Sequence, residues 1–259
     1  MIENITIGAD PELFLINEKT GKVVSAIGII PGEKGNAWVG PGMEEGFGLE
    51  IDNILAEFNI PPAQTKEEFT RSITFMLDYI TKFVKNINPD LGIKCIASQI
   101  VDEDQLQHPI AKLFGCSVDY CAYKEGPNKK PKGEKTCLRS GGFHCHVGYN
   151  NPNTEESIEL VKYMDVYLGI PSVVKDPDTQ RRKLYGKAGA FRLTEYGYEY
   201  RTLSSFMLRH TDFVYEQTMK AIDAYNKGVK LPSPTIVQRV INNSKIEEAQ
   251  KLIEKYNLV

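Results

Sequence analysis

Residues 5–12 read Ile-Thr-Ile-Gly-Ala-Asp-Pro-Glu, and the alternation in this segment indicates the fold class. Its odd-numbered residues are apolar up to position 9, while its even-numbered residues include Asp10 and Glu12. This alternation is typical of a strand with one buried face, because successive side chains of a strand point to opposite sides of the sheet. We therefore predict a strand over residues 4–16 that carries two carboxylates on one face.

Three later segments repeat this arrangement of two polar side chains separated by one residue. They are residues 48–59 with Glu50 and Asp52, residues 142–148 with His144 and His146, and residues 196–203 with Glu199 and Arg201. Each pair shares a sheet face, because residues i and i+2 of a strand lie on the same side. Pro61 and Pro62 are predicted to stop the first of these strands. Glu57 lies at an odd spacing from Glu50, so it joins that face only across a bulge or a strand break near Asn53.

Helical patterns lie between and after these strands. The clearest helix covers residues 65–87, where Thr65 and Glu68 form a capping box before an apolar stripe. Other helices are predicted from Asn153 to about residue 168 and, at the C-terminal end, over residues 211–227 and 235–256, where Ser244 and Glu247 indicate a break. This order favours a single α+β domain over residues 1–259, with a largely antiparallel sheet covered on one face by helices.

Three segments have no strand or helix periodicity and are predicted as connections. Residues 31–48 are rich in glycine, which favours a loop over a site, and residues 123–139 are rich in Lys, Gly and Pro, which favours an exposed excursion. Residues 176–192 are basic. Their Arg181, Arg182, Lys187 and Arg192 form either a solvated loop or a clamp for phosphate or carboxylate oxygens.

Composition and charge exclude several classes of protein. The net charge of −3 argues against a general nucleic-acid binder, because phosphate neutralisation needs a basic surface. No stretch approaches the roughly 20 apolar residues that span a bilayer, and the first residues lack the features of a signal peptide. The five cysteines are odd in number and lack CxxC spacing, which argues against a disulfide framework. We therefore expect a cytoplasmic protein with no membrane partner.

A sheet face with several carboxylates, two imidazoles and a guanidinium needs neutralising partners, because isolated buried charges are costly. Oxygen-rich clusters suit Mg²⁺ or Mn²⁺, and imidazoles favour metals that tolerate nitrogen. Each pair alone also has a structural explanation. Asp10 before Pro11 fits a turn, and Glu199 with Arg201 fits a cross-strand ion pair.

Taken in order along the chain, these residues resemble a known family, the phage-type COOH-NH2 ligases, or amidoligases, of the glutamine synthetase and glutamate-cysteine ligase superfamily. The resemblance rests on residues 8–14, 50–62, 141–146, 181–192 and 198–201. It implies a curved antiparallel sheet, a half-barrel or funnel with helices on its outer face. It also implies ATP and Mg²⁺, with Mn²⁺ as a possible substitute, and an acyl-phosphate intermediate on the way to an amide bond.

The same resemblance implies roles for single residues. The expected metal ligands are Glu12, Glu50, Glu57, His144 and Glu199. The expected catalytic residues are Arg201 and Arg192, which would stabilise the transferring phosphoryl group, and Asp10 or Asp52, which would accept the amine proton. The expected nucleotide-binding residues are Arg181, Arg182, Lys187 and His146.

The chain is much shorter than the two namesake enzymes, so their substrates and assembly do not transfer to it. The carboxylate and amine substrates remain open among small molecules, peptides, protein termini and modified nucleobases, and so does an oligomer. Phage origin, as the resemblance implies, would place the protein in the cytoplasm of the host cell. Two alternatives are a Zn-dependent hydrolase that uses His144, His146 and a carboxylate, and an inactive nucleotide-binding scaffold.

Overall fold

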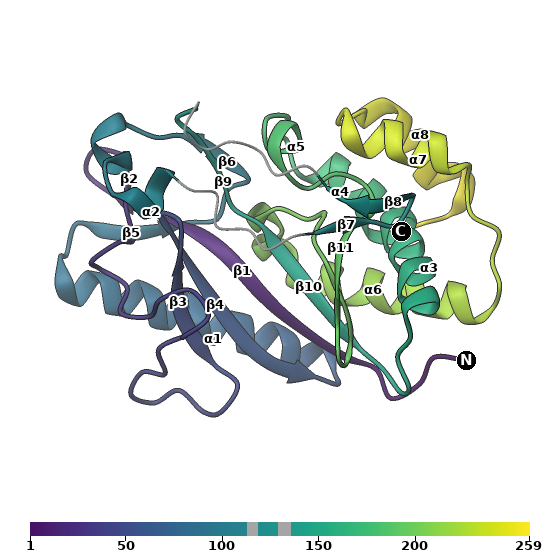
Figure 1. Cartoon of the computed structure of the whole chain (residues 1–259), viewed down its shortest axis with the longest axis horizontal. Helices are drawn as coiled ribbons and strands as arrows, with labels where there is room; N and C mark the ends of the chain where they lie inside the picture. Colours follow the sequence, from purple (N-terminus) through teal and green to yellow (C-terminus); the bar gives the residue numbers. More distant parts are fainter. Residues whose placement is uncertain (113–118, 129–135) are drawn as a thin grey trace.

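A large antiparallel sheet forms the centre of the computed structural model, which describes residues 1–112, 119–128 and 136–259 (Figure 1). Neighbouring strands along the sheet are, in order, β3 (Gly48–Asp52), β4 (Leu55–Ala63), β1 (Thr6–Asn17), β10 (Phe143–Gly148), β12 (Gly197–Tyr200), β11 (Ala190–Thr194), β7 (Tyr120–Cys121) and β8 (Lys124–Pro127). Strands from the N-terminal part of the sequence therefore meet strands from its middle part where β1 pairs with β10. This meeting point positions the candidate site.

Strand β1 is long enough to take part in two sets of pairings. Its first half pairs with β4 and β10, and its second half pairs with β2 (Val23–Val24) and β5 (Leu91–Lys94). A separate two-stranded sheet consists of β6 (Ser98–Ile100) and β9 (Leu138–Ser140).

The expected half-barrel is not what the structure shows. The sheet is antiparallel, as predicted, but it is neither closed nor strongly curled. Closure would require the first and last strands to pair. Among the described residues, β3 and β8 lie at opposite ends of the strand order, and the outer strands β7 and β8 are short.

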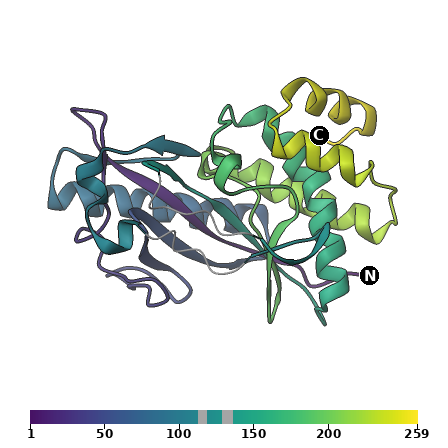
Figure 2. The ribbon, with the colours of Figure 1, turned by 45° about the horizontal axis from the view of Figure 1, so that its top comes forward.

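The longer helices cover one side of the sheet, as predicted (Figures 1 and 2). They are α1 (Lys66–Ile87), α3 (Thr154–Met164) and α6 (Thr211–Asn226). The capping box predicted for α1 is present, because Thr65 accepts a hydrogen bond from the Glu68 N–H and the Glu68 carboxylate accepts one from the Thr65 N–H. The remaining helices are α2 (Pro109–Lys112), α4 (Ile170–Lys175), α5 (Arg181–Leu184), α7 (Pro234–Asn242) and α8 (Ile246–Tyr256).

The main hydrophobic core lies between these helices and the sheet. The apolar parity of β1 points into it, where Ile7 and Leu13 are buried with Phe69 and Ile73 of α1. Cys145 and Tyr198 continue the same apolar layer on the neighbouring strands. Because these apolar side chains face the core, the alternate polar side chains of the same strands lie on the opposite face of the sheet.

The hairpin β3–β4 explains how Glu50 and Glu57 share a face. The predicted break near Asn53 is confirmed, because Asn53 adopts a left-handed conformation with φ of 59° between the two strands. The prediction that Pro61 and Pro62 end the strand is wrong, since β4 continues to Ala63. Its pairing with β3 stops at Asn59, so the prolines lie where β4 has a partner on the β1 side only.

Two other expectations need correction. Residues 129–135 of the predicted excursion lie outside the described residues, but Arg139 is buried in β9 rather than exposed. Residues 190–194, within and just after the predicted basic connection, form the strand β11. The predicted break in the C-terminal helix is confirmed between α7 and α8, where Ser244 has φ of 49°.

Within the described ranges, no helix is both long and apolar enough to cross a membrane. The cysteines at positions 95, 121, 137 and 145 are free thiols.

Candidate active site

The strand register brings the predicted polar residues together. Asp10 of β1 lies opposite His144 of β10, and Glu12 lies opposite Glu57 of β4. The same register continues outward on both sides. Glu57 pairs with Glu50 of β3, while His146 pairs with Glu199 of β12, which pairs in turn with Arg192 of β11. Six strands thus contribute to one polar sheet face.

A pocket of about 730 Å³ opens over this face. Most of the predicted site residues line it, together with two residues that were not predicted, Lys34 and Tyr196. The charged and aromatic lining residues are Asp10, Lys34, Glu50, Asp52, Glu57, His144, His146, Arg192, Tyr196 and Arg201.

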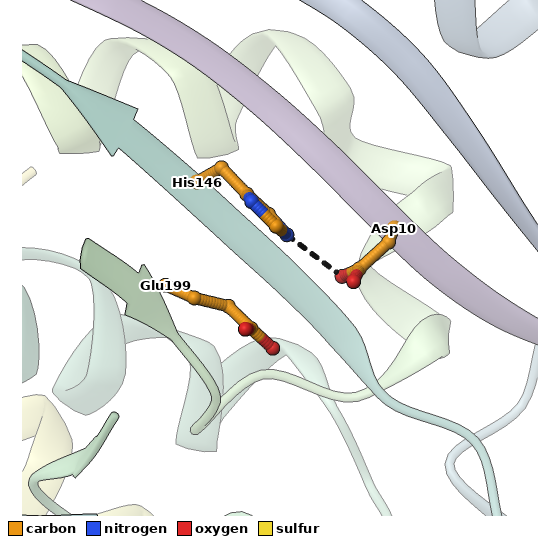
Figure 3. A group of neighbouring side chains, drawn as sticks. All are labelled: Asp10, His146 and Glu199. Atoms are coloured by element: carbon orange, nitrogen blue, oxygen red, sulfur yellow. Dashed lines mark ion pairs between the residues drawn. The ribbon is translucent and has the colours of Figure 1, made fainter. Parts of the chain in front are cut away.

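Asp10 lies between the two imidazoles. Its Oδ1 is 3.1 Å from His144 Nδ1 and 3.1 Å from His146 Nε2. Burial raises the pKa of Asp10, but the two histidines outweigh burial and hold this pKa well below its usual range. Asp10 in turn raises the pKa of His146, against the lowering effect of burial. Figure 3 shows Asp10, His146 and Glu199 projecting from three neighbouring strands toward a common point.

Glu199 is fully buried and is the most heavily paired acid of the site. Its two carboxylate oxygens contact the guanidinium groups of Arg201 and Arg192 separately. One of these oxygens also lies 3.4 Å from His144 Nδ1. Charge-assisted contacts of this kind fix the orientation of a carboxylate. Glu199 is therefore held facing both the histidines and the arginines.

Glu12, Asp52 and Glu57 form a second acidic group on the other side of Asp10. Glu12 accepts a hydrogen bond of 2.7 Å from the Gly142 N–H, whereas Glu57 Oε2 is buried and has no hydrogen-bond partner. Burial, and then the charges of Asp10, Asp52 and Glu12, raise the pKa of Glu57 well above its ordinary value of 4.5. Burial also raises the pKa of Glu12. This group is short of positive charge.

The glycine-rich loop over residues 31–48 supplies two contacts that the sequence did not reveal. The Lys34 ammonium forms an ion pair with Asp52, and the Gly35 N–H donates a hydrogen bond of 2.9 Å to Glu50 Oε2. Burial lowers the pKa of Lys34, but Asp52 and Glu57 raise it above its usual range. The loop therefore lies at the site, as predicted.

These residues fit a divalent metal. Three groups each bring three ligand atoms within 4.8 Å of one another: Asp10, His146 and Glu199; Asp10, Glu57 and His144; Glu12, Asp52 and Glu57. Glu57, whose Oε2 has no hydrogen-bond partner, belongs to two of these groups. Carboxylate oxygens with one imidazole suit Mg²⁺ or Mn²⁺. All five predicted metal ligands lie at this face, with Glu50 beside the groups.

The predicted basic clamp divides into residues near the site and residues away from it. Arg181 lines a small adjoining pocket of about 30 Å³ that shares Asp52, His144 and Arg201 with the large pocket. Its guanidinium donates to the carbonyl oxygens of Thr202 and Arg201 at 3.0 and 3.5 Å. Burial lowers the pKa of Arg181 to about 10.

Arg182 and Lys187 line neither of these two pockets. Arg182 is buried and donates to Ser244 Oγ at 3.2 Å, on the side of the C-terminal helices. Lys187 is exposed. Their predicted contacts with a nucleotide stay predictions.

Sequence reasoning missed Lys34, Tyr196 and Arg139. Tyr196 lies in the turn between β11 and β12, and its hydroxyl contacts His146 Nδ1. Arg139 lines the small pocket and donates to Asn53 Oδ1 at 3.1 Å. One feature of the sequence pointed to Lys34, namely its place between two glycines in a loop already expected over the site. The contacts of Tyr196 with His146 and of Arg139 with Asn53 join residues far apart in the sequence, so no local pattern marks them.

Comparison with known proteins gives a family match that covers part of this site. Residues 136–227 match the sequence model of the phage phiEco32-like COOH.NH2 ligase-type 2 family. The predicted resemblance to phage ligases is confirmed over this segment. No curated protein matches the chain.

The matched segment contains the histidine strand β10, the arginine segment, and strand β12, which carries Glu199 and is directly followed by Arg201. The family description indicates a carbon–nitrogen ligase. Asp10, Glu12, Glu50 and Glu57 lie outside the match, on β1, β3 and β4. The sheet register nevertheless joins them to the ligase-like segment through Asp10 and His144.

Proposed function

We propose that this chain is an ATP- and Mg²⁺-dependent carboxylate–amine ligase that forms an amide bond through an acyl phosphate. One observation carries the proposal. The carboxylate strand β1 pairs in register with the histidine strand β10 of the ligase-like segment, so one buried acidic face lies beside several arginines. Phosphoryl transfer depends on positioning and charge stabilisation, and this face offers groups for both.

The acidic residues would hold the metal. Glu12, Glu50, Glu57, His144 and Glu199 would bind one or more Mg²⁺ ions, whose chemistry is to neutralise phosphate oxygens and orient them. The unpartnered oxygen of Glu57 supports this assignment, because a buried carboxylate normally has a partner.

The arginines would bind the transferring phosphoryl group. Arg201 and Arg192 line the pocket beside Glu199, and Arg181 lines the small adjoining pocket. Guanidinium groups in a partly buried site stabilise the charge of a phosphoryl transition state. We assign Arg181 the same role because it lines the small pocket together with Arg201. Arg182 and Lys187 would bind other parts of the nucleotide.

The reaction follows from these roles. An oxygen of the substrate carboxylate attacks the γ-phosphorus of ATP, the bond to the bridging oxygen breaks, and ADP leaves. The amine nitrogen then attacks the acyl carbon, one amine proton passes to Asp10 or Asp52, and inorganic phosphate leaves as the amide forms. His146, which contacts Asp10 and Tyr196, would bind the nucleotide.

The test is ligation by the purified chain with ATP, Mg²⁺ and pools of amines and carboxylates, followed by ADP release and new masses. We expect ADP and a product lighter by one water than its two substrates. Glu12→Gln and Glu199→Gln should each lower turnover by roughly a hundredfold or more at saturating Mg²⁺, because they remove site carboxylates. Glu103→Gln, on an exposed 3₁₀ turn, is the matched control. Full turnover by either site variant would refute the metal assignment.

A Zn-dependent hydrolase that uses His144, His146 and a carboxylate is a second candidate, because Asp10 Oδ1 lies 3.1 Å from a ring nitrogen of each histidine. It has less support than the ligase, since each of the three ligand groups among the described residues contains at most one of the two histidines. Two imidazoles and a carboxylate form a common catalytic zinc site. Zn²⁺ retained through purification and hydrolysis without ATP would favour this candidate over the ligase.

A further inference from the structure

A tight turn in the glycine-rich loop reaches into the acidic cluster. Residues 33–36 close on themselves, since the Asn36 N–H donates to the Glu33 carbonyl at 2.8 Å and the Glu33 N–H donates to the Asn36 carbonyl at 3.2 Å. Gly35 has φ of +79° at the tip, a conformation that favours glycine. This turn presents Lys34 and the Gly35 N–H to the same strand, β3.

The two contacts of the turn fall on two different carboxylates of β3. Lys34 Nζ pairs with Asp52, and the Gly35 N–H donates to Glu50 Oε2 at 2.9 Å. The Lys34 side chain is 40% exposed, whereas that of Asp52 is 7% exposed. The lysine therefore reaches in from solvent to a buried acid.

The segments on both sides of the turn are fixed to β3. The Ile51 N–H donates to the Gly32 carbonyl at 3.1 Å, and Trp38 and Leu49 exchange backbone hydrogen bonds of 2.8 and 2.9 Å. Among the described residues, the direct contacts that hold the tip of the turn to the acidic face are the ion pair of Lys34 with Asp52 and the hydrogen bond from the Gly35 N–H to Glu50. The tip can therefore leave that face while its flanks stay in place.

Lys34 faces the same carboxylates that would hold a metal. Its charge interacts with Asp52, Glu57 and Glu12, and these three form one of the ligand groups. An ammonium and a divalent cation cannot occupy one position among these oxygens, because their charges repel and the oxygens are shared.

We propose that the turn over residues 33–36 is a built-in competitor of the divalent metal. Lys34 supplies part of the positive charge for the group of Glu12, Asp52 and Glu57 when no metal is bound, and metal binding displaces the lysine and breaks the hydrogen bond from Gly35 to Glu50. The inference rests on the proposed function only for the presence of a metal at this face. Because Lys34 and Gly35 line the pocket, release of the turn would couple metal loading to the shape of the substrate site.

The test combines metal titration with amide exchange on the full chain. Calorimetry should give Lys34→Met about tenfold tighter Mg²⁺ binding than the wild type, a factor that corresponds to about 1.4 kcal/mol. Lys34→Arg keeps the charge and should bind Mg²⁺ as the wild type does. Lys66→Met, which removes the same charge from an ion pair with Glu216, is the control for net charge.

Amide exchange measured by NMR supplies the second readout. Saturating Mg²⁺ should speed exchange of the Gly35 amide at least tenfold and leave the Trp38 amide unchanged, since Trp38 bonds to Leu49 rather than to a carboxylate. A Gly35 amide that stays protected with Mg²⁺ bound would overturn the inference and leave the ligase proposal standing. Absence of Mg²⁺ binding in every variant would overturn both. A released turn in a chain without ligase activity would support the inference and count against the proposed function.

Discussion

Glu57 shows how a single side chain can report on the chemistry of the pocket. It is 7% exposed, one of its oxygens has no hydrogen-bond partner, and three other carboxylates surround it. A carboxylate in such a place is unfavourable unless it takes up a proton or a cation. Glu57 therefore connects the stability of the protein to metal binding.

We predict that Glu57→Gln stabilises the metal-free protein at alkaline pH. The folded-state pKa of Glu57 is raised above its ordinary value of 4.5, so its favourable effect on stability is complete below that value and is lost as pH rises through the folded-state pKa. The variant should therefore gain about 1 kcal/mol or more at pH 8 and little at pH 4. Thermal unfolding in EDTA at both pH values measures this difference.

The Glu57→Gln variant also tests whether Glu57 takes part in Mg²⁺ binding. Mg²⁺ should raise the melting temperature of the wild type, because a ligand that binds only the folded state stabilises it, and should raise that of Glu57→Gln much less. A variant that is less stable than the wild type at pH 8, or equally stabilised by Mg²⁺, would contradict the role given to Glu57.

For single residues, the sequence identified most of the polar side chains of the site but few of the residues that they contact. The spacing of Asp10 and Glu12, and of His144 and His146, identifies residues on a common face because strand geometry is local. Lys34 could not be assigned in this way, because its partner Asp52 lies in a different element and no spacing rule joins a loop to a strand.

Among the elements, the loop before β11 shows how backbone shape controls an arginine. Gly186 has φ of +70°, and a Cβ at this position would lie 1.6 Å from Arg181 Nη1 and 2.8 Å from the Thr202 carbonyl oxygen. The absence of a side chain at Gly186 thus leaves the space that the Arg181 guanidinium occupies.

We predict that Gly186→Ala displaces Arg181 and lowers ligase turnover roughly a hundredfold, the usual scale for losing one stabilising donor. Gly21→Ala is a matched control, since Gly21 also has φ of +70° but has nothing within 4 Å of an added Cβ. Both variants should lose about 1 kcal/mol from the left-handed backbone. Only Gly186→Ala should lose activity in an ADP-release assay, and equal activity in the two would remove Arg181 from the site.

The elements were predicted best where a local signal was strong. The capping box of α1 and the break at Asn53 were found because each depends on neighbouring residues. Strand β11 was missed because it is only five residues long and lies at the end of a basic, glycine-containing segment. The prolines of β4 were misread because their tolerance depends on which side of the strand has a partner.

Across the whole molecule, the sheet joins two parts of the sequence into one site. The ligase-like match covers residues 136–227, while the carboxylates of β1, β3 and β4 precede it. Sequence order alone predicted an antiparallel sheet with helices on one face, and this is confirmed. The half-barrel was wrong because curvature depends on how the outer strands pair, which no single segment of the sequence specifies.

The acyl-phosphate route can be tested by following one oxygen atom of the substrate carboxylate. The chain is incubated with ATP, Mg²⁺, amines and carboxylates labelled with ¹⁸O, and the released phosphate is analysed by mass spectrometry. Ligation through an acyl phosphate should yield ADP, a new amide and phosphate that carries one ¹⁸O atom. The Glu199→Gln variant should form none of these products. Amide formation with AMP and pyrophosphate, or with unlabelled phosphate, would contradict the acyl-phosphate route.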